Sequence, residues 1–174
     1  SFQQTYTKLP KNSLIDENIQ KLAQESTFTI TTGHQLNLFT GPAFFVYKIL
    51  HVIRLCEEVK KAFPTYDFVP IYWMASEDHD FEEIQSTQIF GKKISWETEQ
   101  QGAVGAFQAD SLAEIRTKLH DFFKTNPEAE IHQIIDSYQG KTLSEATFNL
   151  VHKLFADYGL LILEPNTANL KKWF

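Results

Sequence analysis

The 174-residue chain is acidic, with 22 Asp and Glu against 16 Lys and Arg and a formal net charge of −6. This balance weighs against nonspecific binding to nucleic acid or acidic membranes, so we expect neither among its partners. A hydrophobic fraction of 43% indicates a packed globular protein, and a single cysteine, Cys56, excludes an internal disulfide. Because no stretch resembles a signal peptide or membrane span, we expect a cytoplasmic protein.

The first part of the chain alternates helix and strand. Ser13 is a candidate cap for a first helix, and a short strand is expected over Thr27 to Thr31. A polar turn then leads into a helix from Ala43 to about Ala62, with Pro42 suited to its first position. The apolar run Phe68 to Met74 predicts a strand covered on both faces. Strand, helix and strand with short joints form a βαβ unit with parallel strands.

Within that second strand Pro70 is discordant, because proline cannot donate to a strand ladder. The segment around Gly91-Lys92 predicts a hairpin with a type II′ turn at the margin of the sheet. Three helices follow, with predicted caps at Ser111, at Asn126 followed by Pro127, and at Thr142. Gly159 ends the last of them, and Leu160 to Leu163 reads as another buried strand. The chain is therefore predicted to be α/β with a mostly parallel sheet.

In an open parallel sheet, ligands bind beyond the carboxyl ends of the strands. Three polar loops are predicted to meet there, over residues 33–41, 76–83 and 164–167. We take this edge of the sheet as the candidate functional site.

The loop after the first strand is a candidate binding loop for a phosphate or carboxylate, since it runs into a helix N-terminus. The alternative is that its polar side chains only cap the turn. Lys48, two turns into the helix, either reaches the ligand or extends along the apolar face to solvent. The sequence has neither a P-loop nor a dinucleotide-binding glycine pattern. The candidate binding residues are Gly33, His34, Gln35, Asn37, Thr40, Gly41 and Lys48.

The loop after the second strand gathers three carboxylates and an imidazole in four consecutive residues, Glu77, Asp78, His79 and Asp80. Such a cluster can bind a substrate amine, act as a general base or bind a metal. The alternative is a helix N-cap with acidic first-turn residues, although a cap does not account for all four. We predict no metal site, because these ligands are too close in sequence for all to face one ion. The remaining histidines on helices (His51, His120, His132 and His152) are expected to be solvated surface residues.

Long motifs make the chain similar to a known family. Residues 32–42 (TGHQLNLFTGP), Tyr47-Lys48 and residues 73–84 (WMASEDHDFEEI) resemble the bacillithiol biosynthesis protein family BshC, as do residues 102–105 and 157–160 in order. The resemblance implies a Rossmann-like three-layer fold with a β-hairpin insertion and flanking helices. It also implies a much longer protein with connective-peptide insertions and a C-terminal coiled coil, through which the full-length protein forms a homodimer.

The resemblance further implies a ligase that joins the carboxyl group of cysteine to the amine of glucosaminyl-malate. A free carboxylate forms no amide at neutral pH without activation, so ATP is an expected co-substrate. Under this hypothesis His34, Gln35 and Asn37 hold the nucleotide or carboxylate end, while Glu77, Asp78 and Asp80 orient the amine and help remove its proton. Two alternatives remain open: a non-catalytic nucleotide- or sugar-binding fragment, and a metal-dependent hydrolase using Asp78, His79 and Asp80.

The chain starts without methionine and stops in what reads as a new helix, at Trp173-Phe174. We therefore expect residues 1–174 to form a single Rossmann-like domain that is part of a longer multi-domain chain. Both aromatic residues should then be partly exposed, or covered by another chain.

Overall fold

The structure is a computed structural model that describes residues 2–7 and 9–166. The predictions for Trp173, Phe174 and the helix after Thr167 lie outside the described residues. Within the described part, no helix combines the length and the apolar character needed to cross a membrane.

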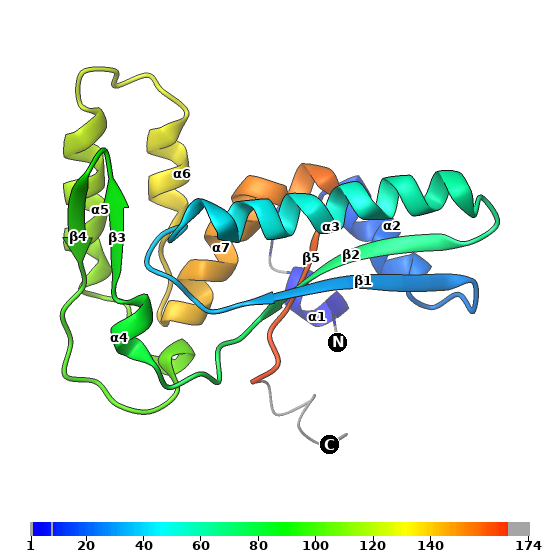
Figure 1. The fold of residues 1–174 in the computed structure, drawn as a ribbon, viewed down its shortest axis with the longest axis horizontal. Coiled ribbons are helices and arrows are strands. Elements are labelled where there is room, and N and C mark those ends of the chain that lie inside the picture. The colour runs from blue at the N-terminus through cyan, green and yellow to red at the C-terminus, as the bar shows by residue number, and fades with distance from the viewer. Residues whose placement is uncertain (1, 8, 167–174) are drawn as a thin grey trace.

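Three strands form one parallel sheet, as the sequence predicts. These are β1 (Thr27–His34), β2 (Asp67–Met74) and β5 (Leu161–Leu163), and they lie in the order β1-β2-β5 (Figure 1). The helix α3 (Ala43–Ala62) joins β1 to β2, and these two strands pair along their full length, from Thr27 opposite Asp67 to His34 opposite Met74. The carboxyl ends of the two strands therefore lie side by side, as the predicted site requires.

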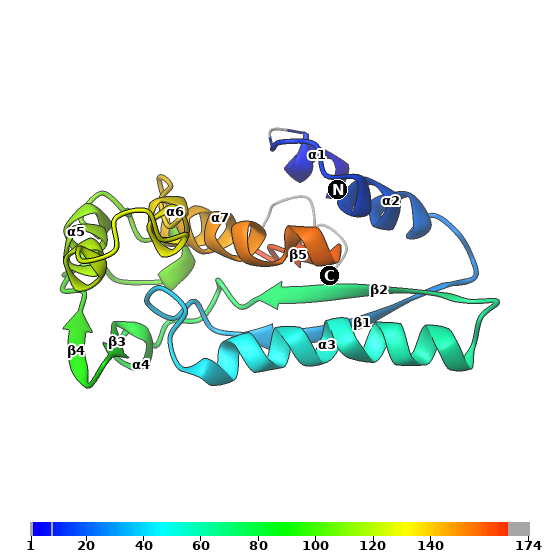
Figure 2. The same ribbon diagram turned by 90° about the horizontal axis from the view of Figure 1, so that it is seen from above.

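Helices cover both faces of this sheet, which gives the predicted three layers (Figure 2). One face packs on α3, where the rings of Tyr72 and Phe45 meet edge-to-face with centroids 5.6 Å apart. The other face packs on α1 (Phe2–Tyr6) and α2 (Ser13–Lys21), which cluster with Val69 and Ile71. Successive side chains of a strand point to opposite faces, so the apolar run of β2 fills both layers.

The long helix α3 carries an apolar stripe that faces the sheet. Its buried side chains are Phe45, Ile49, Val52, Ile53 and Cys56, at the spacing of one helical face. Burial also raises the pKa of the Cys56 thiol to about 12. A thiol with so high a pKa carries almost no thiolate at neutral pH, so Cys56 is a packing residue, as predicted.

Pro70 lies in the central strand, which the sequence alone makes surprising. It pairs with Ile30 of β1, but β5 pairs with β2 only from Ile71 to Trp73. At Pro70 the strand therefore has a paired neighbour on one side only. A proline is tolerated at such a position, because the missing N–H matters only where a ladder bond would form.

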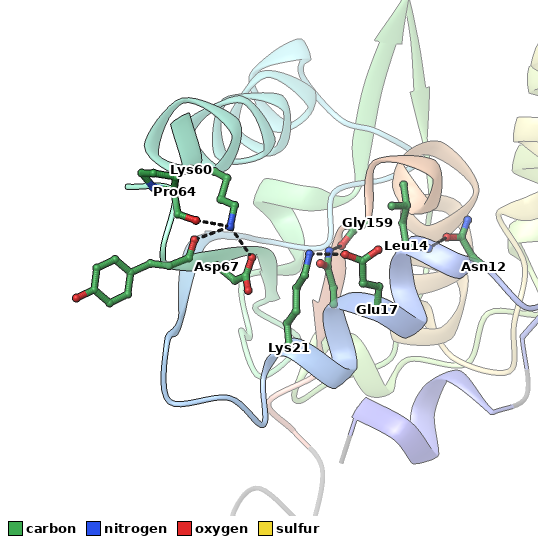
Figure 3. Close-up of polar contacts among 10 residues, drawn as sticks. Asn12, Leu14, Glu17, Lys21, Lys60, Pro64, Asp67 and Gly159 are labelled. Atoms are coloured by element: carbon green, nitrogen blue, oxygen red, sulfur yellow. Dashed lines mark hydrogen bonds and ion pairs between the residues drawn. The ribbon is translucent and has the colours of Figure 1, made fainter. Parts of the chain in front are cut away.

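Polar contacts fix the C-terminal end of α3 and the N-terminal end of α2 (Figure 3). The Lys60 ammonium donates to the carbonyls of Pro64 and Tyr66, at 3.1 and 3.0 Å, and to Asp67 Oδ1 at 3.0 Å. These bonds hold the turn between α3 and β2. The cap of α2 differs from the prediction: Asn12, one residue before Ser13, accepts from the backbone N–H of Leu14 and Ile15.

A second group of elements lies beyond the carboxyl ends of the strands (Figure 1). The predicted hairpin is present, but it forms a separate antiparallel sheet instead of joining the margin of the parallel one. Its two turn residues are Phe90 and Gly91, with φ of 49° and 76°, not Gly91 and Lys92. Two positive φ values are typical of a type I′ turn, whose twist matches that of the strands. The elements of this group are α4 (Phe81–Ile84), β3 (Ser86–Ile89), β4 (Lys92–Ser95), the 3₁₀ helix η1 (Val104–Ala106), α5 (Leu112–Phe123) and α6 (Ile131–Ser137). The helix α7 (Leu143–Phe155) runs from this group back over the sheet, and the 3₁₀ helix η2 (Ala156–Tyr158) then leads into β5 (Figure 2).

The predicted helix caps after the hairpin have mixed outcomes. Thr142 caps α7 by accepting from the Glu145 N–H, as predicted. Ser111 precedes α5 but does not cap it, because its Oγ accepts from the Trp96 indole at 2.8 Å. Asn126-Pro127 opens a turn instead of a helix, and α6 begins only at Ile131. Gly159 ends η2 in the left-handed region, with φ of 71°, as its predicted stop role requires.

The expectation of solvated helical histidines is wrong for three of the four. His120 and His132 stack with centroids 5.0 Å apart, and their Nδ1 atoms lie 2.7 Å from each other. His120 Nε2 also lies 2.9 Å from Asp136 Oδ1. His152 is half-buried against the rings of Tyr6 and Phe148. Only His51 is exposed as expected.

Candidate functional site

The end of β1 places a histidine at the carboxyl edge of the sheet. The sequence predicts that Gly33 and His34 belong to the turn after the strand. In the structure the strand runs to His34, so these two are its last residues. Pro42 is likewise the N-cap of α3 and not its first helical residue. No side chain caps α3 at Pro42, which leaves this helix start open toward the loop.

His34 lies in a half-buried, mostly aromatic setting. Its ring meets Phe45 edge-on with centroids 5.4 Å apart, and its Nδ1 lies 3.0 Å from Asn37 Nδ2 and 3.2 Å from the Gln35 carbonyl oxygen. Burial lowers the pKa of His34, and the nearby Lys48 ammonium lowers it further. The imidazole is therefore neutral at pH 7, with one nitrogen that donates and one that accepts.

Gln35 joins the two predicted loops. Its Nε2 donates to Asp78 Oδ2 at 2.6 Å and to Glu83 Oε2 at 2.9 Å. The first of these bonds holds the pKa of Asp78 below its usual range, and the backbone N–H groups of Asp80 and His79 lower it further. Asp78 is therefore a stable carboxylate at neutral pH, directly beside the loop that carries His34.

The other acidic-loop residues do not gather around one point. Asp80 caps α4 through a bond from the Glu83 N–H to its Oδ1 at 3.1 Å, which is the capping role weighed from the sequence. Glu77 and His79 have exposed side chains, while Asp78 Oδ1 accepts from the backbone of its own loop. Among residues 2–7 and 9–166, no group of three or more His, Cys, Asp and Glu is arranged to hold a metal ion.

The remaining candidates of the first loop shape it. Lys48 Nζ donates to the Gly33 carbonyl at 2.7 Å, so the ammonium lies at the end of β1 and does not merely extend to solvent. Gly41 has φ of 57°, and a Cβ there would lie 2.4 Å from Asn37 Cβ, so only glycine closes this turn without a clash. Asn37 is buried and Thr40 is half-buried in the same turn.

The third loop is tied to the second across 88 residues of sequence. Ser76 Oγ donates to Glu164 Oε1, which also accepts from the Asn166 N–H at 2.9 Å. The Tyr72 hydroxyl donates to the His34 carbonyl at 3.1 Å, and burial together with the Glu164 charge raises the pKa of Tyr72. The three loops therefore meet at one edge of the sheet, as predicted.

Sequence reasoning included the loops of Ser76 and Glu164 but did not single out these two residues. It also gave no role to Gly105, which donates its N–H to the Ser76 carbonyl at 3.0 Å. A Cβ on Gly105 would lie 2.4 Å from Ser144 Oγ and 2.5 Å from Ser76 Cβ. The position of Glu164, directly after a buried strand, was the available signal for its place at the edge.

Comparison with known proteins gives a consistent result. Residues 1–174 match the family model described as "Bacillithiol biosynthesis BshC, N-terminal Rossmann-like domain". A protein of Flavobacterium psychrophilum named "Putative cysteine ligase BshC" is 51% identical over 172 residues, which are 97% of this chain and 32% of that protein.

Two further relatives carry the same name. The Cytophaga hutchinsonii protein is 44% identical over 170 residues, covering 97% of this chain and 31% of the relative. The Bacillus cytotoxicus protein is 30% identical over 167 residues, covering 90% of this chain and 31% of the relative. The chain thus spans about a third of the length of the curated relatives it matches.

Proposed function

The chain belongs to the BshC family, whose N-terminal Rossmann-like domain it matches from residue 1 to 174, and on this premise we propose that it is the substrate-binding part of a cysteine ligase. The proposed reaction joins the carboxyl group of cysteine to the amine of glucosaminyl-malate in bacillithiol biosynthesis. The relatives' name supports a ligase. The observation that carries the proposal is the bond from Gln35 to Asp78, which brings the two polar loops to one edge of the sheet.

Amide formation sets the chemical demands on this edge. A carboxylate is a poor electrophile, and we propose that ATP supplies the phosphoryl or adenylyl group that activates it. His34 is suited to this end of the site, because its neutral imidazole offers one nitrogen that donates and one that accepts, and Asn37 and the Gln35 carbonyl oxygen hold its Nδ1 edge in place. Lys48 adds a positive charge at the end of β1, which favours a carboxylate or phosphate nearby.

The acidic loop is suited to the amine. Because its pKa is lowered, the Asp78 carboxylate keeps its charge and can hold an ammonium group in place, but it is a weak base. We therefore assign orientation of the amine to Asp78, with the exposed Glu77 and His79 free to contact substrate or accept a proton. Asp80 supports this loop as the cap of α4.

A second candidate function is a non-catalytic nucleotide- or sugar-binding unit whose chemistry needs other parts of a longer protein. The short span of the chain relative to its relatives favours this candidate. From the family resemblance we also propose that the full-length protein is a cytoplasmic homodimer held together by a coiled coil. Isothermal titration of the 174-residue chain with ATP, glucosaminyl-malate and divalent metal ions separates binding of nucleotide, of sugar alone and of metal.

The test of the ligase proposal uses the full-length protein that contains this chain. We expect His34→Ala and Asp78→Asn each to reduce formation of the cysteine–glucosaminyl-malate amide at least about tenfold, the effect of losing one charged or polar substrate contact. Thermal stability should stay near that of the unmodified protein, because neither side chain fills the core. Normal product formation by both variants would contradict the proposal, and the two loops would then be structural.

A further inference from the structure

A groove of about 500 Å³ runs between the outer strand β1 and the helix α3. Its lining includes Ile30 and Thr31 from the strand and Phe44, Tyr47 and Leu55 from the helix. One end of the groove reaches the candidate site, because the Phe44 ring also meets the His34 ring, with centroids 6.2 Å apart. Whatever occupies the groove therefore lies beside the His34 loop.

The helix side of the groove exposes large apolar side chains. Phe44 and Tyr47 are 61% and 68% exposed, and Leu55 is 38% exposed. The buried stripe of α3 that packs on the sheet is a different set of residues, so these three are not needed to hold the helix in place. Several large apolar side chains that gather on one exposed face mark a surface that another segment or protein covers.

The strand side of the groove is an unpaired sheet edge. β1 is the outer strand of the order β1-β2-β5, and within the described part of the chain no strand lies on its other side (Figure 1). Alternate backbone N–H and C=O groups of such an edge point away from the sheet and can pair with a further strand. Free backbone groups beside an apolar helix face suit an extended peptide segment, which adds a strand to the sheet.

The strand order indicates where such a segment belongs. Along the chain the sheet grows in one direction, from β1 to β2 to β5, with all pairs parallel. This order is that of the first half of a doubly wound sheet, in which the fourth strand pairs with the free side of the first. Ligands of such sheets bind where the strand order reverses, beyond the carboxyl ends of the first and fourth strands.

The relatives contain enough further sequence to supply this strand. The matched residues make up 32% of the Flavobacterium psychrophilum protein and 31% of the Cytophaga hutchinsonii protein. Most of each relative therefore lies outside the matched part, which the family model describes as N-terminal.

We propose that, in the full-length protein, an apolar strand from outside residues 1–174 pairs in parallel with the free edge of β1 and packs on Phe44, Tyr47 and Leu55. β1 then becomes an inner strand, and the His34 loop lies between two strand ends instead of at the margin of the sheet. The segment that follows the added strand forms a second wall of the ligand site. That wall rests on the proposed function, because it takes the His34 loop as a substrate-binding loop, whereas the strand pairing does not.

Two leucines of α3 give a matched test of whether the groove is covered in the full-length protein. Leu55 and Leu50 are both 38% exposed, but of the two only Leu55 lines the groove. Each is replaced by cysteine, and the rate of maleimide labelling is measured; the native Cys56 is buried and reacts little. We expect Leu55→Cys to be labelled at least about tenfold more slowly than Leu50→Cys. Equal rates would overturn the proposal.

Photo-crosslinking identifies what covers the groove. The exposed Tyr47 is replaced by p-benzoylphenylalanine in the full-length protein, and the cross-linked peptides are mapped by mass spectrometry. We expect a cross-link to a residue of the same polypeptide outside residues 1–174. A cross-link to a second copy, which doubles the mass, would overturn the proposal, as would cross-links confined to residues 1–174.

Hydrogen exchange in the full-length protein tests the strand pairing itself. A strand paired on both sides protects consecutive amides over residues 27–34, whereas an edge strand protects only every second one. Alternating protection would contradict the added strand. Product formation by the unmodified protein is measured separately: protected amides without ligation would leave the pairing standing and refute the ligase, and ligation with alternating protection would do the reverse.

Discussion

Gln35 and Asp78, 43 residues apart, are joined by a 2.6 Å bond from the side-chain amide to the carboxylate. Because His34 and Met74 are paired at the ends of β1 and β2, the two loops start side by side and need only one such bond to lock together. The bond also sets the charge state of the site, since it is the largest cause of the lowered pKa of Asp78.

Replacing Gln35 tests that electrostatic role. In Gln35→Leu the pKa of Asp78 should rise toward the ordinary value of about 3.9, because the main hydrogen bond to its charged form is gone. A pH titration of the Asp78 carboxyl carbon by NMR measures the shift. The control is Gln88→Leu on the exposed face of β3, which should leave it unchanged. An unmoved Asp78 titration in Gln35→Leu would mean that the backbone N–H groups alone hold the charge.

Gly105 tests how tightly η1 packs against the second loop and the start of α7. Gly105→Ala should reduce the free energy of unfolding by about 2 kcal/mol, because the new Cβ would overlap Ser144 and Ser76 and force one of them aside. Gly33→Ala is the matched control, since the nearest atom to its Cβ is 3.8 Å away. Urea denaturation of both variants gives the comparison. Equal stabilities would show that the loop yields at little cost.

His152 predicts a pH dependence of stability. Its Nδ1 is buried without a partner among the described residues, and burial lowers its pKa although Asp157 opposes this. A group whose folded pKa is lowered contributes stability in full above its unfolded pKa, about 6.5 for histidine. That contribution is lost as the pH falls below 6.5 through the folded pKa.

The variant His152→Phe removes both the titration and the unpaired nitrogen. We expect a gain of roughly 1 kcal/mol at pH 7, because a phenyl ring packs against Tyr6 and Phe148 without an orphan polar atom. Stability should also fall less between pH 7 and pH 5 than in the unmodified protein. His51→Phe, at an exposed position, is the control. An unaltered slope of stability against pH would exclude His152 as a source of acid sensitivity.

Lys60 and Lys61 are adjacent but differ in what they hold. Lys60 reaches two carbonyl oxygens of the turn before β2 and the carboxylate of Asp67 at the start of β2 (Figure 3). Lys61 instead forms an exposed ion pair with Glu58. Lys60→Met should cost about 1 kcal/mol, and Lys61→Met close to zero, because exposed pairs contribute little. Thermal unfolding of the two variants measures the difference. Equal losses would show that the turn holds without the Lys60 ammonium.

The sheet could be predicted from the sequence because its strands carry strong local signals. The apolar run of β2 marks a strand buried on both faces. The apolar stripe of the joining helix α3 shows which face of that helix packs on the sheet. The polar residues at the strand ends then follow from parallel topology. Parallel topology alone therefore predicts that the His34 and Asp78 loops are neighbours, independently of the Gln35 bond.

The helix caps and long-range contacts that were predicted wrongly or missed have no local sequence signal that would determine them. Asn12 and Ser13 are both good caps, and only the folded chain shows which side chain reaches the free N–H groups. Asn126-Pro127 opens turns as readily as helices. The contacts of Glu164 with Ser76, and of His120 with His132, join distant segments whose register no sequence pattern fixes.

The position of β1 at the edge of the sheet has a consequence for handling the protein. Its eight residues pair with β2 on one side, and among the described residues no strand pairs with the other side. Residues 27–32 contain no charge and no proline, the usual protections of an exposed edge. Preparations of this chain should therefore self-associate through added strands as concentration rises, and a lysine placed at Thr29 or Thr31 should keep them monomeric.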